Sequence, residues 1–147
     1  MNRPIQVWGH RGWRGAGHPP ENSRESFQAA VDQGADGIEF DLFLSRDDQL
    51  VVFHDDTLER MTDGTGNVTA RTVAELKRLR LKDSTGRPTE SVIPTLDEVL
   101  DLVERFRQAL PANDRARSFV ANLEIKEMPG KNIAQSVAAA VTRRLQQ

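Results

Sequence analysis

Two acidic residues separated by a single position are the first candidates for chemistry. Glu39 and Asp41 lie within an alternating segment that begins at Ile38. Residues two apart in a β-strand project from the same face, so their carboxylates are expected to be neighbours. Adjacent carboxylates repel each other, and a bound Ca²⁺ or Mg²⁺ relieves that repulsion through hard oxygen ligands. The pattern therefore indicates a divalent-cation site, with a strand that has a polar outer face as the plainer alternative.

A further acidic residue occurs late in another apolar segment. Glu124 and Lys126 are again two residues apart, at the end of the segment Phe119–Ile125. Such a pair can supply one metal ligand and one cation for a phosphate group. The pattern leaves an ordinary surface ion pair open as the alternative.

Two histidines directly follow predicted strands or end them, and both have charged neighbours. His10 and Arg11 are neighbours and are flanked by Gly9 and Gly12. The Arg11 guanidinium can bind a phosphate through two parallel hydrogen bonds. His54 is followed by Asp55, which can orient the imidazole. Because two histidines near carboxylates and an arginine suit proton transfer, we expect acid–base chemistry from His10 and His54. The third histidine, His18, lies in a Gly/Pro-rich loop and is expected to be non-catalytic.

The composition argues against several classes of protein. The chain has 147 residues, no cysteine and a formal net charge of −2. Without cysteine there are no disulfides, thiolate nucleophiles or cysteine metal sites. Nucleic-acid-binding domains usually carry a basic excess, so a nucleic-acid phosphodiesterase is a poor candidate. No apolar run is long enough to span a membrane, and the first residues lack the apolar core of a signal peptide, so a cytoplasmic protein is expected.

The candidate residues are expected to lie on the strands and loops of one α/β domain. Alternation and short apolar runs predict strands, whereas apolar residues repeating every three or four positions predict helices. The predicted strands are Ile5–Trp8, Ile38–Leu44, Leu50–His54 and Phe119–Ile125, and the predicted helices begin at Asn22 or Ser23, Thr72, Thr95 and near Ile133. Only the turn 46–49 separates the second strand from the third, so these two should form an antiparallel hairpin. Elsewhere strands alternate with helices, which favours a mostly parallel sheet.

The predicted helices carry start signals and an apolar stripe. Thr72 and Thr95 are each followed three residues later by glutamate, the pattern of a capping box. The first of these two helices is predicted to run from Thr72 to Leu79. The second should bury one face formed by Leu96, Val99, Leu100, Val103 and Phe106.

Five short motifs, taken together and in this order, closely resemble those of glycerophosphodiester phosphodiesterases. They are Gly9-His10-Arg11-Gly12, Pro20-Glu21-Asn22-Ser23, Glu39-Phe40-Asp41, His54-Asp55 and Leu123-Glu124-Ile125-Lys126. Order and spacing match from Ile5 to about Lys126, and the combination is far more specific than any single motif. Ser23 stands where the family often has threonine, and the loop 13–19 is slightly long and aromatic.

The resemblance implies a fold, a reaction and a role for each matched residue. It implies a TIM-like (β/α) barrel that hydrolyses glycerophosphodiesters to sn-glycerol 3-phosphate and an alcohol such as choline or ethanolamine. His10 and His54 match the acid–base pair, and Arg11 and Lys126 match the contacts to the substrate phosphate. The residues that match metal ligands are Glu39, Asp41 and Glu124. We expect one divalent cation, Ca²⁺ or Mg²⁺, because Zn²⁺ usually takes nitrogen or sulfur ligands as well.

The length of the chain is short for this fold. A (β/α)₈ barrel typically needs about 250 residues. We therefore expect residues 1–147 to form the N-terminal half of a glycerophosphodiester phosphodiesterase domain, with the C-terminal half absent. The open sheet edges should be covered by the rest of a longer polypeptide or by self-association. Two functional alternatives stay open: a lysophospholipase D-like phosphodiesterase, and a non-catalytic half-barrel that binds a phosphodiester or a partner chain.

Overall fold

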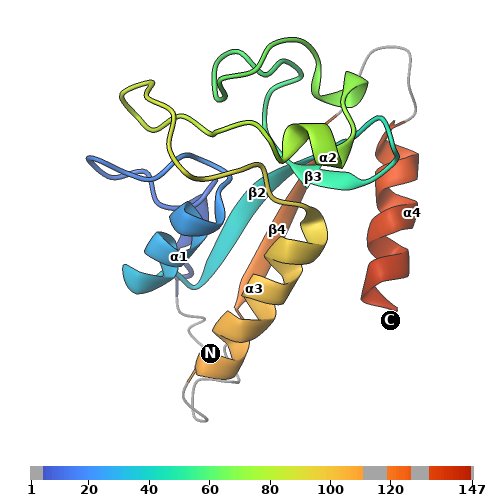
Figure 1. Ribbon diagram of the computed structural model, residues 1–147. Helices are drawn as coiled ribbons and strands as arrows, with labels where there is room; N and C mark the ends of the chain where they lie inside the picture. Colours follow the sequence, from blue (N-terminus) through green and yellow to red (C-terminus); the bar gives the residue numbers. More distant parts are fainter. Residues whose placement is uncertain (1–4, 111–118, 127–132, 147) are drawn as a thin grey trace.

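The computed structural model describes residues 5–110, 119–126 and 133–146, which form a four-stranded sheet with helices packed against it (Figure 1). The strands are β1 (Trp8–His10), β2 (Gly37–Leu44), β3 (Leu50–Val52) and β4 (Val120–Ile125). The helices are α1 (Arg24–Asp32), the 3₁₀ turn η1 (Val68–Ala70), α2 (Val73–Leu76), α3 (Leu96–Ala109) and α4 (Ile133–Leu145). Strands and helices alternate as the sequence predicts. None of the described helices is long and apolar enough to cross a membrane.

Strand β2 is the centre of the sheet and sets the positions of the candidate residues. β1 and β4 pair with it in parallel, and β3 pairs with it antiparallel, so the predicted hairpin is confirmed. The register places His10 opposite Glu39 and Asp41 opposite Glu124. Because parallel strands end at the same edge of a sheet, the pairing brings side chains from β1, β2 and β4 to one edge.

The main core lies between the sheet and helices α1 and α3. The Phe27 and Phe40 rings pack at a centroid distance of 5.8 Å, and Phe106 packs on Phe119 at 5.4 Å. Val137 of α4 is fully buried in the same cluster. Removal of this apolar surface from water is the dominant favourable contribution to folding. The core therefore fixes β2, which carries two of the candidate carboxylates.

A second hydrophobic cluster lies under the long segment between β3 and α3. The hairpin residues Phe43 and Val51 contribute to it, and so do apolar side chains from the segment itself: Phe53, Leu58, Val68, Leu76, Leu81 and Ile93. Leu42 and Val52, their neighbours in the hairpin, belong to the main core. Both faces of the hairpin are thus buried. The second cluster holds the segment that carries His54 against the sheet.

The helix starts follow the predicted chemistry, with two differences. Thr72 and Thr95 each form the predicted capping box with the glutamate three residues later. At α1 the cap is Ser23, and its reciprocal partner is Ser26 rather than an acidic residue. The helix predicted from Thr72 to Leu79 is wrong in length: α2 ends at Leu76, because the backbone N–H groups of Arg78 and Leu79 bond to carbonyls three residues back and no longer four.

One detail of the burial pattern and two predicted strands are also corrected. The strand predicted at Leu50–His54 ends at Val52, where its pairing with Leu42 stops. In α3 Leu102 joins the buried face, and Leu100, which was expected there, is only partly buried but packs against the same core. The strand predicted at Ile5–Trp8 is wrong: pairing begins at Trp8, opposite Gly37, and ends at His10. Residues before Trp8 lie beyond the start of β2, and Ile5 and Val7 are accordingly 91% and 63% exposed.

Within the described chain, β1 and β4 each pair with β2 and have no strand on their other side. An unpaired edge exposes backbone donors and acceptors that another strand can bind. That these edges are covered by more polypeptide or by a second copy stays a prediction.

Candidate active site

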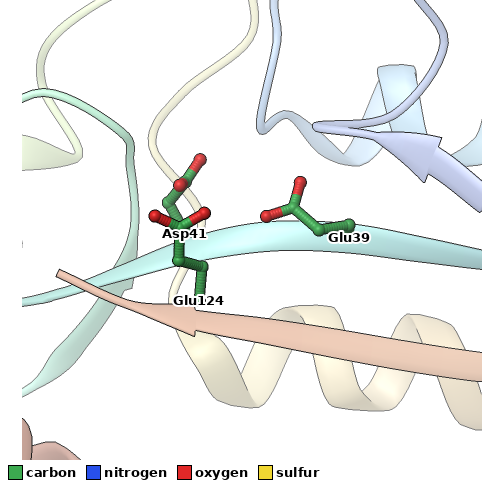
Figure 2. Close-up of side chains that lie close together, drawn as sticks. All are labelled: Glu39, Asp41 and Glu124. Atoms are coloured by element: carbon green, nitrogen blue, oxygen red, sulfur yellow. The ribbon is translucent and has the colours of Figure 1, made fainter.

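Three carboxylates from two neighbouring strands converge at one edge of the sheet. Glu39 and Asp41 project from β2, and Glu124 projects from β4 beside them (Figure 2). One oxygen of each carboxylate lies within 4.8 Å of the others. Asp41 is fully buried and Glu39 nearly so, whereas the Glu124 side chain is about half exposed. The pairing of Asp41 with Glu124 across the strands produces this closeness directly.

Glu39 has one satisfied and one unsatisfied carboxylate oxygen. Its Oε2 accepts a hydrogen bond from the backbone N–H of Arg11 at 3.1 Å and lies 3.8 Å from His10 Nε2. Its Oε1 is buried without a hydrogen-bond partner among the described residues. Burial and the negative charge of Asp41 raise the pKa of Glu39 above its usual value. A buried acceptor of this kind is costly unless a ligand satisfies it.

Asp41 is held by one amide and two cations. Asn22 donates its side-chain amide to Oδ2 at 2.9 Å, and Arg11 Nε lies 3.3 Å from the same oxygen. Lys126 Nζ makes an ion-pair contact of 2.9 Å with Oδ1 and donates a hydrogen bond to Glu124. Burial would lower the pKa of Lys126, but Glu124 and Asp41 outweigh burial and raise it. Together the amide and the two cations fix the orientation of the Asp41 carboxylate.

The donor set fits a hard divalent cation. It consists of three carboxylates, and one buried oxygen of Glu39 is still without a partner. Ca²⁺ and Mg²⁺ take oxygen ligands of this kind. Glu39, Asp41 and Glu124 are the residues that would hold the ion.

A tight turn after β1 presents the next pair of candidate residues. Arg11 has a φ of 57° and Gly12 a φ of 89°, so the chain reverses immediately after His10. A Cβ on Gly12 would lie 2.3 Å from Ser26 Oγ, which leaves no room for a side chain there. The turn brings the Arg11 backbone N–H to Glu39 and leaves the His10 side chain 61% exposed.

The second histidine belongs to a network of charged side chains. His54 Nδ1 lies 2.5 Å from Asp55 Oδ1, and Arg60 binds both oxygens of Asp55. Arg60 also donates to Glu21 at 2.7 Å. The hydrogen bonds from Arg60 and His54 lower the pKa of Asp55 to about 2. His18 makes a separate hydrogen bond to the Pro19 carbonyl.

Glu21 connects this network to the carboxylate cluster. It is almost fully buried and contacts three guanidinium groups, those of Arg11, Arg14 and Arg60, at 2.7–3.3 Å. Burial by itself would raise the pKa of Glu21, but the three arginines together hold it below its usual value. Arg11 therefore bridges Glu21 and Asp41.

Sequence reasoning gave Glu21, Asn22 and Arg60 no part in the candidate site. Glu21 and Asn22 are polar residues directly before α1 and yet are only 4% and 2% exposed. Their place in one of the five motifs was the available signal. Arg60 had no local signal, because its partner Glu21 is 39 residues away in the sequence.

The comparisons with known proteins decide the family. The model of the glycerophosphoryl diester phosphodiesterase family matches residues 10–146. The chain belongs to this family. A glycerophosphodiester phosphodiesterase of Bacillus altitudinis is 39% identical over 123 residues, which cover 83% of this chain and 45% of that protein. One of Caldanaerobacter subterraneus is 38% identical over 121 residues, or 82% and 44% of the two chains.

Solved structures of the family agree with the fold. A phosphodiesterase of Oleispira antarctica, in complex with its product sn-glycerol-3-phosphate, matches with a TM-score of 0.79 at 34% identity. The match covers 97% of this chain and 52% of that one. A glycerophosphoryl diester phosphodiesterase of Parabacteroides distasonis gives a TM-score of 0.70 at 37% identity, and the match covers 92% of this chain and 43% of that one.

The chain thus spans about half the length of the family members that it matches. The expected fold class, α/β and half of a TIM-like (β/α) barrel of the phosphodiesterase type, is confirmed. Named members of the family are phosphodiesterases, which are hydrolases. The roles expected for the matched residues in this chain stay predictions: His10, His54, Arg11, Lys126, Glu39, Asp41 and Glu124.

Proposed function

We propose that the protein hydrolyses glycerophosphodiesters to sn-glycerol 3-phosphate and an alcohol, with one divalent cation bound by Glu39, Asp41 and Glu124. The convergence of these three carboxylates within 4.8 Å is the observation that carries the proposal. The product named with the Oleispira antarctica phosphodiesterase supports the same class of substrate. Because the chain spans about half the length of its relatives, the activity is a proposal, for which this chain provides the matched groups.

The metal ligands and their neighbours have separate tasks. A divalent cation held by the three carboxylates would supply Lewis-acid polarisation of a phosphoryl oxygen. Asn22 and Arg11 keep Asp41 and Glu39 oriented for such an ion through the contacts described above. Arg11 and Lys126 place positive charge beside the cluster, where it can stabilise charge that develops on the phosphoryl oxygens.

The two histidines supply proton transfer. One removes the proton of the attacking oxygen, and the other protonates the leaving alkoxide. His10 reaches Glu39 from the exposed end of β1, and His54 is held by Asp55. The attacking oxygen is either the glycerol 2-hydroxyl, which gives a cyclic phosphate that water opens, or water itself.

A second candidate substrate class is supported by two exposed indoles. Trp8 and Trp13 are 41% and 38% exposed, and they flank the turn that carries His10. Trp8 and His10 are two apart in β1 and therefore share a face. An apolar surface beside the site suits the acyl chain of a lysophospholipid, which would make the protein a lysophospholipase D-like enzyme.

A turnover assay tests the function and separates the alternatives. The protein is incubated with glycerophosphocholine or lysophosphatidylcholine, and release of sn-glycerol 3-phosphate, lysophosphatidic acid and choline is measured. We expect turnover that EDTA abolishes and that Ca²⁺ or Mg²⁺ restores, with D41N inactive under all conditions. Preference for lysophosphatidylcholine would favour the second candidate. Binding of glycerophosphocholine without turnover would contradict the enzymatic proposal and favour a non-catalytic half-barrel.

A further inference from the structure

Arg60 contacts two carboxylates, those of Asp55 and Glu21, although its side chain is about half exposed. Its Nε lies 2.5 Å from Asp55 Oδ2, and its terminal nitrogen donates to Asp55 Oδ1 at 2.8 Å. The same nitrogen donates to Glu21 Oε1 at 2.7 Å. Two-point binding of a carboxylate by a guanidinium fixes the orientation of both groups. Arg60 therefore links the Asp55 carboxylate to Glu21, an acidic residue that is itself buried.

Asp55 is in turn the hydrogen-bond partner of His54. The Asp55 carboxylate has two oxygens, and Oδ1 is shared between His54 Nδ1 and Arg60. The Asp55 side chain is 18% exposed, so water has little access to replace either contact. The His54 ring is consequently connected through Asp55 to Arg60 and from there to Glu21.

We propose that Arg60 is a positioning residue that fixes the orientation and the tautomer of His54 by holding the Asp55 carboxylate. The proposal rests on the acid–base role of His54 in the proposed function and adds a residue that acts on that histidine from outside the five motifs. Arg60 itself touches none of the carboxylates in the cation cluster that the structure describes.

The chemistry of the contact determines which tautomer is held. An ionised carboxylate only accepts hydrogen bonds, so His54 must carry its hydrogen on Nδ1 in this pair. Nε2 is then free to accept a proton and afterwards to donate it. The low pKa of Asp55 agrees with a carboxylate that stays ionised near neutral pH.

Glu21 explains why an arginine is required at this position. The guanidinium reaches three oxygens on two residues at once, whereas a lysine ammonium is a point charge without a fixed fork. Glu21 is buried and contacts Arg11 as well, so it provides a rigid anchor for the far side of Arg60. A lysine would keep the charge next to Asp55 but would lose two-point binding.

Nuclear magnetic resonance of the histidine ring nitrogens tests the proposal on the 147-residue chain. The variants are R60Q and R60K, with R80Q as the matched control. Arg80 belongs to the same segment and is 44% exposed against 47% for Arg60, but it pairs with the exposed Glu90 at 3.9 Å. Circular dichroism establishes which variants are folded.

In the wild-type protein we expect the neutral form of the His54 ring to carry its hydrogen on Nδ1 and none on Nε2. In R60Q the shifts of both ring nitrogens should move toward averaged values, and the side-chain couplings should show more than one rotamer. R60K should lie between R60Q and wild type, and R80Q should match wild type. This pattern would support Arg60 as a positioning residue.

Three results would overturn the proposal. They are a wild-type His54 whose neutral ring carries its hydrogen on Nε2, a folded R60Q with unchanged His54 shifts, and an R80Q variant that changes His54 as much as R60Q does. If R60Q does not fold, R60K decides, and an R60K spectrum identical to wild type would contradict the proposal. The measurement needs neither a metal ion nor turnover, so its failure is distinguishable from failure of the proposed function.

Discussion

Asn22 donates its side-chain amide to Asp41 Oδ2 at 2.9 Å, across 19 residues of sequence. Both side chains are buried, and Asn22 adopts a left-handed backbone conformation with a φ of 56° to reach this position. Asparagine tolerates that conformation better than most residues. This hydrogen bond orients the Asp41 carboxylate, although Asn22 is not itself one of the proposed metal ligands.

Replacement of Asn22 by alanine should weaken both the fold and the ion site. A buried Asp41 oxygen would lose its amide donor, which costs about 1–3 kcal/mol of stability. Loss of a residue that orients a ligand typically lowers metal affinity roughly 10- to 100-fold. Urea unfolding and calorimetric titration of Ca²⁺ measure the two effects. Asn67→Ala, at an exposed position with no side-chain capping bond, is the control and should change neither quantity.

His10→Ala and His54→Ala should each remove most turnover of glycerophosphocholine while leaving the fold intact. A general acid or base contributes roughly 10²- to 10⁴-fold in rate, and we expect a loss of kcat in that range. His18→Ala is the matched control, because its ring contacts only the Pro19 carbonyl among the hydrogen bonds described. Near-wild-type kcat in either variant of an active preparation would show that the assignment of that histidine is wrong.

Acid should remove the contribution of Asp55 to stability. Its pKa in the folded protein is about 2, below the usual 3.8, so the folded state favours the ionised form. The stabilisation is present above pH 3.8 and disappears as the pH falls through about 2. The difference in free energy of unfolding between wild type and Asp55→Asn should therefore shrink between about pH 5 and pH 2. Urea unfolding across this range measures it, and a difference that grows in acid would refute the assignment.

The cap of α3 should be worth a measurable part of the stability. Thr95 Oγ1 accepts from the Glu98 backbone N–H at 3.3 Å, and Glu98 accepts from the Thr95 backbone N–H at 2.8 Å. Thr95→Ala should lower the free energy of unfolding by about 1 kcal/mol, whereas Thr95→Ser should retain most of it. Denaturant unfolding compares the two, and equal losses would mean that the hydroxyl does not act as a cap.

Local signals were sufficient for much of the fold. The Arg46–Gln49 turn between two apolar runs predicted the hairpin, and the capping boxes at Thr72 and Thr95 marked two helix starts. Strand β1 was predicted three residues too early, because the apolar run 5–7 extends past the start of its partner strand. Hydrophobicity alone does not report where a neighbouring strand begins.

The carboxylate cluster was predictable, whereas its charged surroundings were not. The spacing of Glu39 and Asp41 follows from strand geometry, and the motif order added Glu124. The contact of Arg60 with Glu21 depends on how the segment after β3 packs on its own hydrophobic cluster, which has no periodic signature. Tertiary packing therefore decided the residues that sequence reasoning missed.

Calorimetric titration of Ca²⁺ and Mg²⁺ into the 147-residue chain tests whether the three carboxylates bind a divalent cation. We predict one binding event per chain in the wild type, lost in E39Q and D41N and weakened in E124Q, because the Glu124 side chain is about half exposed. Glu90→Gln is the control, because the Glu90 side chain is 99% exposed, and it should bind as the wild type does. No binding by the wild type, or equal binding by wild type and D41N, would contradict the claim that these three carboxylates hold a divalent cation.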